Sequence, residues 1–178
     1  MKLLRTIRLD PSDTFVFDRA AEPGEWAVSG AFEYWDQDLD GLTGKTRAAF
    51  RSGFLGVASL GRSTLVQIVE TDQTGRKDAV ETLAKSLVEH FGAPDLDAAR
   101  AAAEEEVDFA QSLCDYPPDM LIAVHRIVED GSIREAFRSL QAKGGPKPLR
   151  AFTFLEVQGE DEPEERVDLA GLAEGKRQ

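Results

Sequence analysis

Hydrophobic residues recur at every second position in several short segments near the N-terminus, a spacing that is typical of half-buried β-strands. Leu3–Leu9 alternates in this way and is followed by a Pro-Ser-Asp turn. The short run Thr14–Asp18 and the longer segment Trp26–Trp35 come next, with a Pro-Gly turn between them. Because strands joined by short turns usually pair, these three segments predict an antiparallel meander.

Apolar residues recur at three- and four-residue spacing in the middle of the chain, which indicates helices. The pattern is clearest over Arg76–Phe91, which ends just before a glycine and a proline. A second, alanine-rich helix is expected from Asp95 or Asp97 to about Leu113. A shorter helix is expected over Thr46–Ser52.

The remaining elements are predicted as strands and one further helix. Thr64–Glu70 is apolar on both faces, which is typical of a central strand, and Met120–Val128 is a second buried strand. Ser132 and Glu135 fit a capping box and predict a helix. Ala151–Val157 is the last predicted strand, and the order strand, helix, strand favours a parallel crossover.

These elements predict one α+β domain over residues 1–157, with antiparallel N-terminal strands followed by strand–helix units and with helices packed on a mixed sheet. A chain of 178 residues is long enough to bury one self-sufficient core. Residues 158–178 differ, because acidic residues cluster around Pro163 and apolar residues are few. This segment is predicted to be an acidic C-terminal tail or an arm that docks on a basic surface.

The composition argues against several classes of protein. No stretch approaches the roughly eighteen uncharged apolar residues that a membrane helix requires, so no membrane partner is expected. Arg5 and Arg8 interrupt the apolar run that a signal peptide would need. The only cysteine, Cys114, has no partner for an internal disulfide, which favours a reducing, cytoplasmic location.

Acidic residues exceed basic ones, and the net charge of −12 would repel the phosphates of nucleic acids, so no nucleic-acid partner is expected. The charge is unevenly distributed, because residues 41–77 carry a net charge of +4 and residues 78–119 carry −9. The simpler interpretation is that both signs solvate exposed faces. The alternative is that the basic segment contacts the acidic block of a second copy, forming a homodimer, or contacts a protein partner.

One Asp-rich segment resembles the beginning of a calcium-binding loop. Asp36, Asp38 and Asp40 alternate and precede Gly41, as carboxylates and glycine do in such loops. The twelfth position, which should supply a bidentate glutamate, is Arg47. A solvated turn is therefore favoured and no metal or other cofactor is expected, with the three aspartates as the alternative metal site.

A glycine-rich segment carries the second candidate site. Gly56–Ser63 has the spacing of a phosphate-binding loop, with arginine in place of lysine. It precedes a predicted strand instead of opening a helix, so nucleotide hydrolysis is not expected. The simpler interpretation is a turn with ordinary glycines and surface arginines. The alternative is that the Gly53–Ser63 connection holds a small anionic ligand, such as a carboxylate or phosphate. Its candidate anion-binding residues are Arg47, Arg51, Arg62 and Ser63.

Candidate catalytic residues are scattered along the chain. Cys114 and His125 have no partner at a catalytic spacing, and the acids of Glu104–Glu106 point in different directions around their predicted helix. The leading hypothesis is therefore a non-enzymatic interaction or accessory protein, able to self-associate. Binding of a small anion is the second hypothesis. An enzyme whose site is assembled from these distant segments is the third.

Three segments in the N-terminal half resemble a known family: MKLLRTIRLDPSDTFVF, EPGEWAVSGAF and LTGKTRAAFRSGFLG. They are similar to a proteobacterial family of small acidic proteins known only as a domain of unknown function, and the likeness is expected to run from Met1 to about Val157. The resemblance implies a bacterial, cytoplasmic protein. It implies no activity and assigns no site residues.

Overall fold

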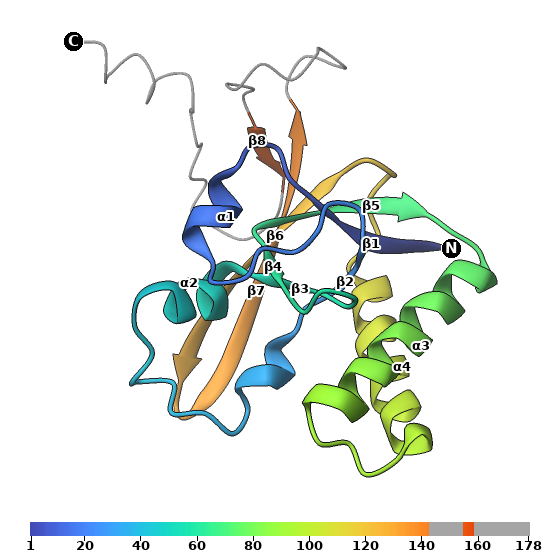
Figure 1. The fold of residues 1–178 in the computed structure, drawn as a ribbon. Coiled ribbons are helices and arrows are strands. Elements are labelled where there is room, and N and C mark those ends of the chain that lie inside the picture. Colours follow the sequence, from blue (N-terminus) through green and yellow to red (C-terminus); the bar gives the residue numbers. More distant parts are fainter. Residues whose placement is uncertain (143–154, 159–178) are drawn as a thin grey trace.

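In the part of the chain that the structure describes, eight strands form one antiparallel sheet that is flanked by helices (Figure 1). The computed structural model describes residues 1–142 and 155–158. The strands are β1 (Lys2–Ile7), β2 (Trp26–Val28), β3 (Phe54–Gly56), β4 (Arg62–Ser63), β5 (Leu65–Glu70), β6 (Leu121–Glu129), β7 (Ser132–Ala142) and β8 (Leu155–Gln158). The helices are α1 (Ser12–Val16), the 3-10 helix η1 (Ala31–Tyr34), α2 (Gly44–Ser52), α3 (Gln73–His90) and α4 (Leu96–Ser112).

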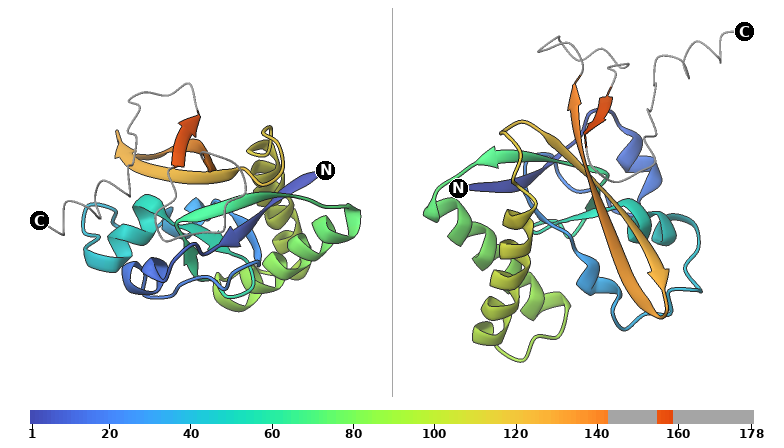
Figure 2. Two further views of the ribbon diagram at one scale, coloured as in Figure 1. Left: turned by 90° about the horizontal axis from the view of Figure 1, so that it is seen from above. Right: turned by 180° about the vertical axis from the view of Figure 1, so that it is seen from behind.

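The strand order is β4-β3-β2-β1-β5-β6-β7-β8, and each neighbouring pair is antiparallel. Helices α3 and α4 lie side by side at one end of the molecule, whereas α1 and α2 lie at the other (Figure 2). The long β6–β7 hairpin extends past the short strands toward the loop that precedes α2 (Figure 1). The tip of this hairpin is therefore bordered by segments from distant parts of the chain.

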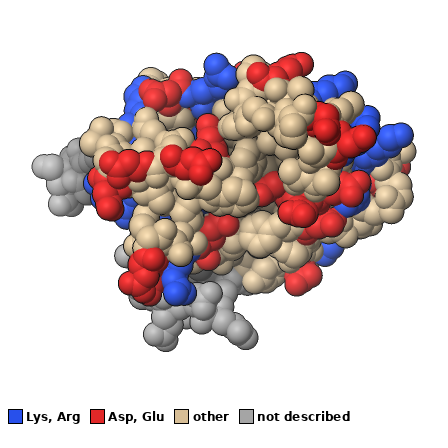
Figure 3. Space-filling model, turned by 90° about the horizontal axis from the view of Figure 1, so that it is seen from below, with Lys and Arg blue, Asp and Glu red and all other residues tan. Residues whose placement is uncertain are grey.

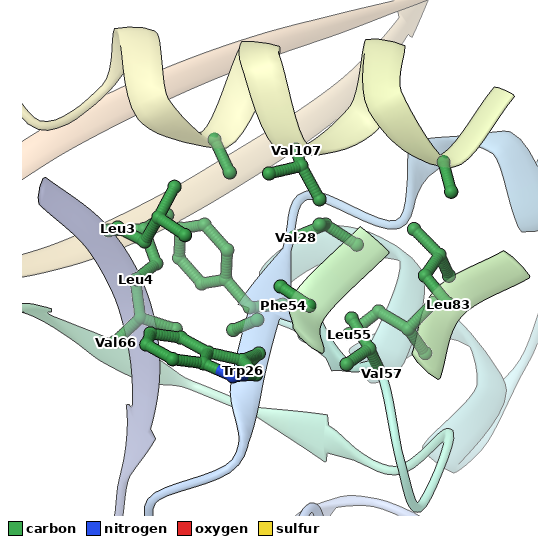
Figure 4. Packing of buried hydrophobic residues seen from close by; sticks show 14 of the residues in the cluster. Leu3, Leu4, Trp26, Val28, Phe54, Leu55, Val57, Val66, Leu83 and Val107 are labelled. Carbon is green, nitrogen blue, oxygen red and sulfur yellow. The ribbon is translucent and has the colours of Figure 1, made fainter. Parts of the chain in front are cut away.

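The main core forms where α3 and α4 pack on the short strands. Alanines line the buried stripe of α4, among them Ala103, and their small side chains allow close contact with α3. Val107 of α4 lies above Leu3, Val28 and Phe54 of three different strands (Figure 4). Burial of these apolar side chains supplies most of the driving force for folding.

Local hydrogen bonds fix where the two long helices begin. The Asp72 carboxylate accepts a hydrogen bond from the Gly75 amide at 3.0 Å, and Asp95 accepts one from Ala98 at 2.7 Å. Both aspartates are N-caps that satisfy amides without intrahelical partners. The predicted helices in these regions are confirmed. The strands predicted over Leu3–Leu9, Thr64–Glu70 and Met120–Val128 are found as β1, β5 and β6.

The predicted N-terminal meander is wrong. Thr14–Asp18 lies partly in α1, and Trp26–Trp35 continues as a strand only as far as Val28. Gly30 has a φ of 76°, a left-handed conformation that turns the chain into η1. A Cβ at this position would lie 2.5 Å from the Cβ of Leu55, so glycine is also required by packing.

The helix predicted from Ser132 and Glu135 is also wrong, because this segment is β7. Asp130 and Gly131 both have positive φ and form the two-residue turn that joins β6 to β7. β8 then pairs with β7 in antiparallel orientation, so the predicted parallel crossover is absent and the sheet is antiparallel instead of mixed.

The α+β class with helices packed on a sheet is confirmed. The first part of the predicted strand Ala151–Val157 lies outside the described residues, whereas its end is found in β8. The predicted acidic tail or docking arm over 158–178 also lies outside them, apart from Gln158 at the end of β8.

Candidate functional site

A buried arginine organises the region between the β6–β7 hairpin and α2. Arg126 of β6 is 0 % exposed, and its Nε donates to Oε2 of Glu135 on β7 at 2.9 Å. Its Nη1 donates to the carbonyls of Phe50 at 2.9 Å and Gly53 at 2.8 Å. Its Nη2 donates to the carbonyl and, at 3.2 Å, to the hydroxyl of Ser29. All five N–H donors of the guanidinium are therefore in use.

The acceptors explain why an arginine is placed in this interior. The carbonyls of Phe50 and Gly53 lie at the C-terminal end of α2, where they lack intrahelical partners and a positive charge is favoured. Burial lowers the pKa of Arg126 from its ordinary value, and the neighbouring Glu135 carboxylate opposes this shift. Arg126 thus joins β6, β7, α2 and the segment before η1.

A second buried arginine supports the same helix end. Arg62 of β4 donates to the carbonyls of Gly53 at 3.1 Å and Gly30 at 3.3 Å, and forms an ion pair with Glu33. Its guanidinium lies 5.0 Å from the centre of the Tyr34 ring. Burial raises the pKa of Tyr34, and the charge of Arg62 opposes that rise.

The four predicted anion-binding residues fall into two separate pairs. Ser63 is buried, and its hydroxyl donates to the carbonyls of Leu65 at 2.6 Å and Ile7 at 3.3 Å, so Ser63 and Arg62 both serve the fold. Arg47 and Arg51 lie one turn apart on α2 and are exposed. Neither guanidinium group makes a hydrogen bond or an ion pair within the described part of the chain.

Arg47 and Arg51 line a pocket of about 330 Å³, which we call the arginine pocket. Asp40 and the buried Arg126 also border it. Apolar side chains form the rest of its wall, namely Leu39, Leu42, Phe50, Ile127 and Val128. The pocket thus combines two unpaired guanidinium groups with an apolar surface.

The predicted aspartate loop does not form a metal centre in the described structure. Asp36, Asp38 and Asp40 lie in the loop between η1 and α2, and only Asp40 borders the arginine pocket. Within residues 1–142 and 155–158, no group of three or more His, Cys, Asp or Glu side chains is arranged to hold a metal ion.

A second pocket, of about 250 Å³, contains two glutamates and is called the acidic pocket. Glu135 of β7 and Glu106 of α4 line it, together with Ser29, Ala31, Trp35, Phe109 and Ile133. Burial is the main cause that raises the pKa of Glu106 to about 7, and the charge of Glu135 adds to the effect. The charge of Arg126 opposes both.

Sequence reasoning missed Arg126, and it did not distinguish Glu106 from its exposed neighbours Glu104 and Glu105. Glu106 lies three residues after Ala103 and four before Ala110, which places it beside the buried stripe of α4. This helical spacing was the available signal. Arg126 gives no comparable signal except its place in an apolar strand, two residues after Val124 on the same face.

The three candidate catalytic elements are placed differently in the structure. Cys114 is 3 % exposed, its thiol donates to the carbonyl of Ala110 at 3.3 Å, and burial raises its pKa to about 11. His125 lies on the exposed face of β6. Glu104 and Glu105 are exposed on α4. The described structure shows no contact that brings Cys114, His125 and these acids together.

Charged side chains are spread over one face of the molecule (Figure 3). Figure 3 shows acidic side chains spread over the lower face of the molecule, with basic side chains mainly near its edges. No helix in the described residues has both the length and the apolar character needed to cross a membrane.

The fold and its pockets define an α+β protein with a curled antiparallel sheet, paired helices and a long hairpin that borders the arginine pocket and the acidic pocket. The chain belongs to the Family of unknown function (DUF6505), whose model matches residues 1–153. Searches of curated proteins and of solved structures found no match. The expected membership of a domain family of unknown function is confirmed, whereas a proteobacterial origin and a cytoplasmic location stay predictions.

Proposed function

We propose that this protein is a non-enzymatic binding protein whose arginine pocket holds a small amphipathic anion, a carboxylate or phosphate attached to an apolar group. The observation that carries this proposal is that Arg47 and Arg51 line one pocket of about 330 Å³ together with five apolar side chains. Pockets of this size are at the small end of the range that holds organic ligands.

The position of the two arginines favours an anion between them. Residues four apart on a helix share a face, and like charges at this spacing repel each other. Arg51 benefits from its place in the last turn of α2, but Arg47 lies further from the negative helix end. A carboxylate or phosphate would accept hydrogen bonds from both guanidinium groups and relieve the repulsion.

The rest of the pocket fits the apolar part of such a ligand. Ile127 and Val128 at the hairpin tip are 45 % and 38 % exposed, and they border the pocket with Leu39 and Leu42. Arg126 adds positive charge beneath them, although its donors are occupied and its charge is balanced by Glu135. An alkyl chain would cover this surface while its charged end meets α2.

Octanoate is a suitable probe, and calorimetric titration with thermal melting is a suitable measurement. Binding should raise the melting temperature, and the double variant Arg47→Gln/Arg51→Gln should lose both signals. The matched control is Lys85→Gln, which removes an exposed positive charge from α3. Acetate lacks the long alkyl chain and octanol lacks the negative charge, so the two compounds test the two parts of the ligand separately.

Two results would reject the proposal. The first is an unchanged melting temperature and no heat of binding with octanoate or octyl phosphate. The second is equal binding by wild type and the double arginine variant. Binding of octylammonium in place of the anions would likewise contradict it, because the proposal requires a negative charge.

Self-association through the hairpin tip is the second candidate function. Three large apolar side chains near the tip are exposed, namely Trp35 at 69 %, Ile127 and Val128. Sedimentation velocity at low and high salt tests this idea. A monomer under both conditions would exclude a homodimer.

A further inference from the structure

We infer that the acidic pocket binds an organic cation, specifically a primary ammonium group attached to an aromatic or alkyl body. The inference rests on the walls of this cavity and is independent of the arginine pocket. Its two carboxylates come from different elements, Glu106 from α4 and Glu135 from β7, and both border the same hollow of about 250 Å³.

The charges in the pocket leave one carboxylate without compensation. Glu135 accepts hydrogen bonds from Arg126 and Ser29 through a single oxygen, Oε2. The carboxyl group of Glu106 makes no hydrogen bond and no ion pair in the described structure. One guanidinium therefore faces two carboxylates, and a cation entering the pocket would restore the balance.

Aromatic side chains provide the second part of the site. Trp35 is 69 % exposed and Phe109 is 39 % exposed, although both border the pocket. Edge contacts with Phe32 and Phe137 hold the two rings in place. An ammonium group is attracted both to the face of an aromatic ring and to carboxylates. One ligand of this class can therefore interact with the aromatic side chains and with the carboxylates of the pocket.

Burial is the main cause of the raised pKa of Glu106, and three charged groups modify it. They are Glu135 from β7, Arg126 from β6 and Glu105 from α4 itself. With a pKa of about 7, Glu106 is mostly protonated at mildly acidic pH and mostly ionised at mildly alkaline pH. Binding of a cation should therefore strengthen as pH rises.

The test uses calorimetric titration of the full chain with phenethylamine. Affinity should increase about tenfold between about pH 6 and about pH 8, following the ionised fraction of a group with a pKa near 7. Glu106→Gln should remove this pH dependence and weaken binding at the higher pH. The matched control is Glu104→Gln, which removes an exposed carboxylate from the same helix and should bind as wild type does.

Further ligands test whether the positive charge is required, and a further variant separates this site from the arginine pocket. 2-Phenylethanol and phenylacetate, which lack the positive charge, should not bind. Arg47→Gln/Arg51→Gln should leave phenethylamine affinity unchanged, so failure of the arginine pocket would not affect this result. The inference is overturned if phenethylamine does not bind at about pH 8, if Glu104→Gln weakens binding as much as Glu106→Gln, or if calcium binds there and the amine does not.

Discussion

Replacing Glu106 with glutamine should change how the stability of this protein depends on pH. The pKa of Glu106 is raised from 4.5 to about 7 in the folded protein, because the carboxyl group is buried near Glu135. Between these two values the folded state binds more protons than the unfolded state. Protonated Glu106 therefore contributes to the stability of the folded protein below pH 4.5, and this contribution is lost as pH rises through about 7.

The size of the effect follows from the shift. A change of about 2.5 in pKa corresponds to about 3 kcal/mol of unfolding free energy. Between about pH 5 and about pH 8, wild type should therefore lose about 2 to 3 kcal/mol relative to Glu106→Gln. The neutral amide keeps the shape of the side chain and carries no charge into the pocket.

Urea denaturation across this pH range measures the difference directly. Glu104→Gln should show the same pH dependence as wild type, because Glu104 is exposed and does not line the pocket. The reasoning is refuted if wild type and Glu106→Gln differ by the same free energy at the lower and the higher pH. That result would mean that Glu106 ionises alike in the folded and unfolded states.

Two further predictions concern the interior. Arg126→Met should lower the unfolding free energy by about 3 to 5 kcal/mol, because it removes the cation paired with Glu135 and the donor to the buried carbonyl of Phe50. Urea denaturation would contradict this prediction if the loss stayed below about 1 kcal/mol. Iodoacetamide should alkylate Cys114 at least a hundredfold more slowly in the native protein than in urea, since a pKa of about 11 leaves little thiolate. Mass spectrometry measures both rates, and equal rates would show that the thiol is accessible.

The long helices and several strands follow from the sequence alone. Over α3, apolar residues such as Val80, Leu83 and Leu87 recur at helical spacing, and Asp72 and Asp95 supply local caps. These signals lie within a few residues of each other, so they do not depend on the rest of the fold. The predicted central position of Thr64–Glu70 is also confirmed, because β5 lies between β1 and β6.

The C-terminal hairpin shows where local signals mislead. Ser132 and Glu135 have the spacing of a capping box, but nine residues of β6 pair with β7 and outweigh that signal. The Asp-Gly pair at the turn was the stronger indication, because it is typical of a two-residue hairpin. Pairing between strands supplies hydrogen bonds to more backbone N–H and C=O groups than a single helix cap does.

The candidate sites also contain residues that the sequence singled out and residues whose environment depends on the fold. The sequence singled out Arg47 and Arg51 because they lie near the glycine-rich connection in the chain, and the structure places both at one pocket. Arg62 was grouped with them by proximity in sequence, yet it is buried and bound to carbonyls. Glu106 was grouped with exposed acids, and only the packing of α4 against β7 gives it a different environment.

The sequence by itself determined the α+β class, the two long helices and the segments that become buried strands, since periodic burial is a local property of the chain. Only the tertiary structure decided that Arg126 faces Glu135 across β6 and β7, and that Glu106 joins the same pocket. Such environments depend on which distant segments meet. The pKa values and unpaired charges they create therefore follow from the assembled fold.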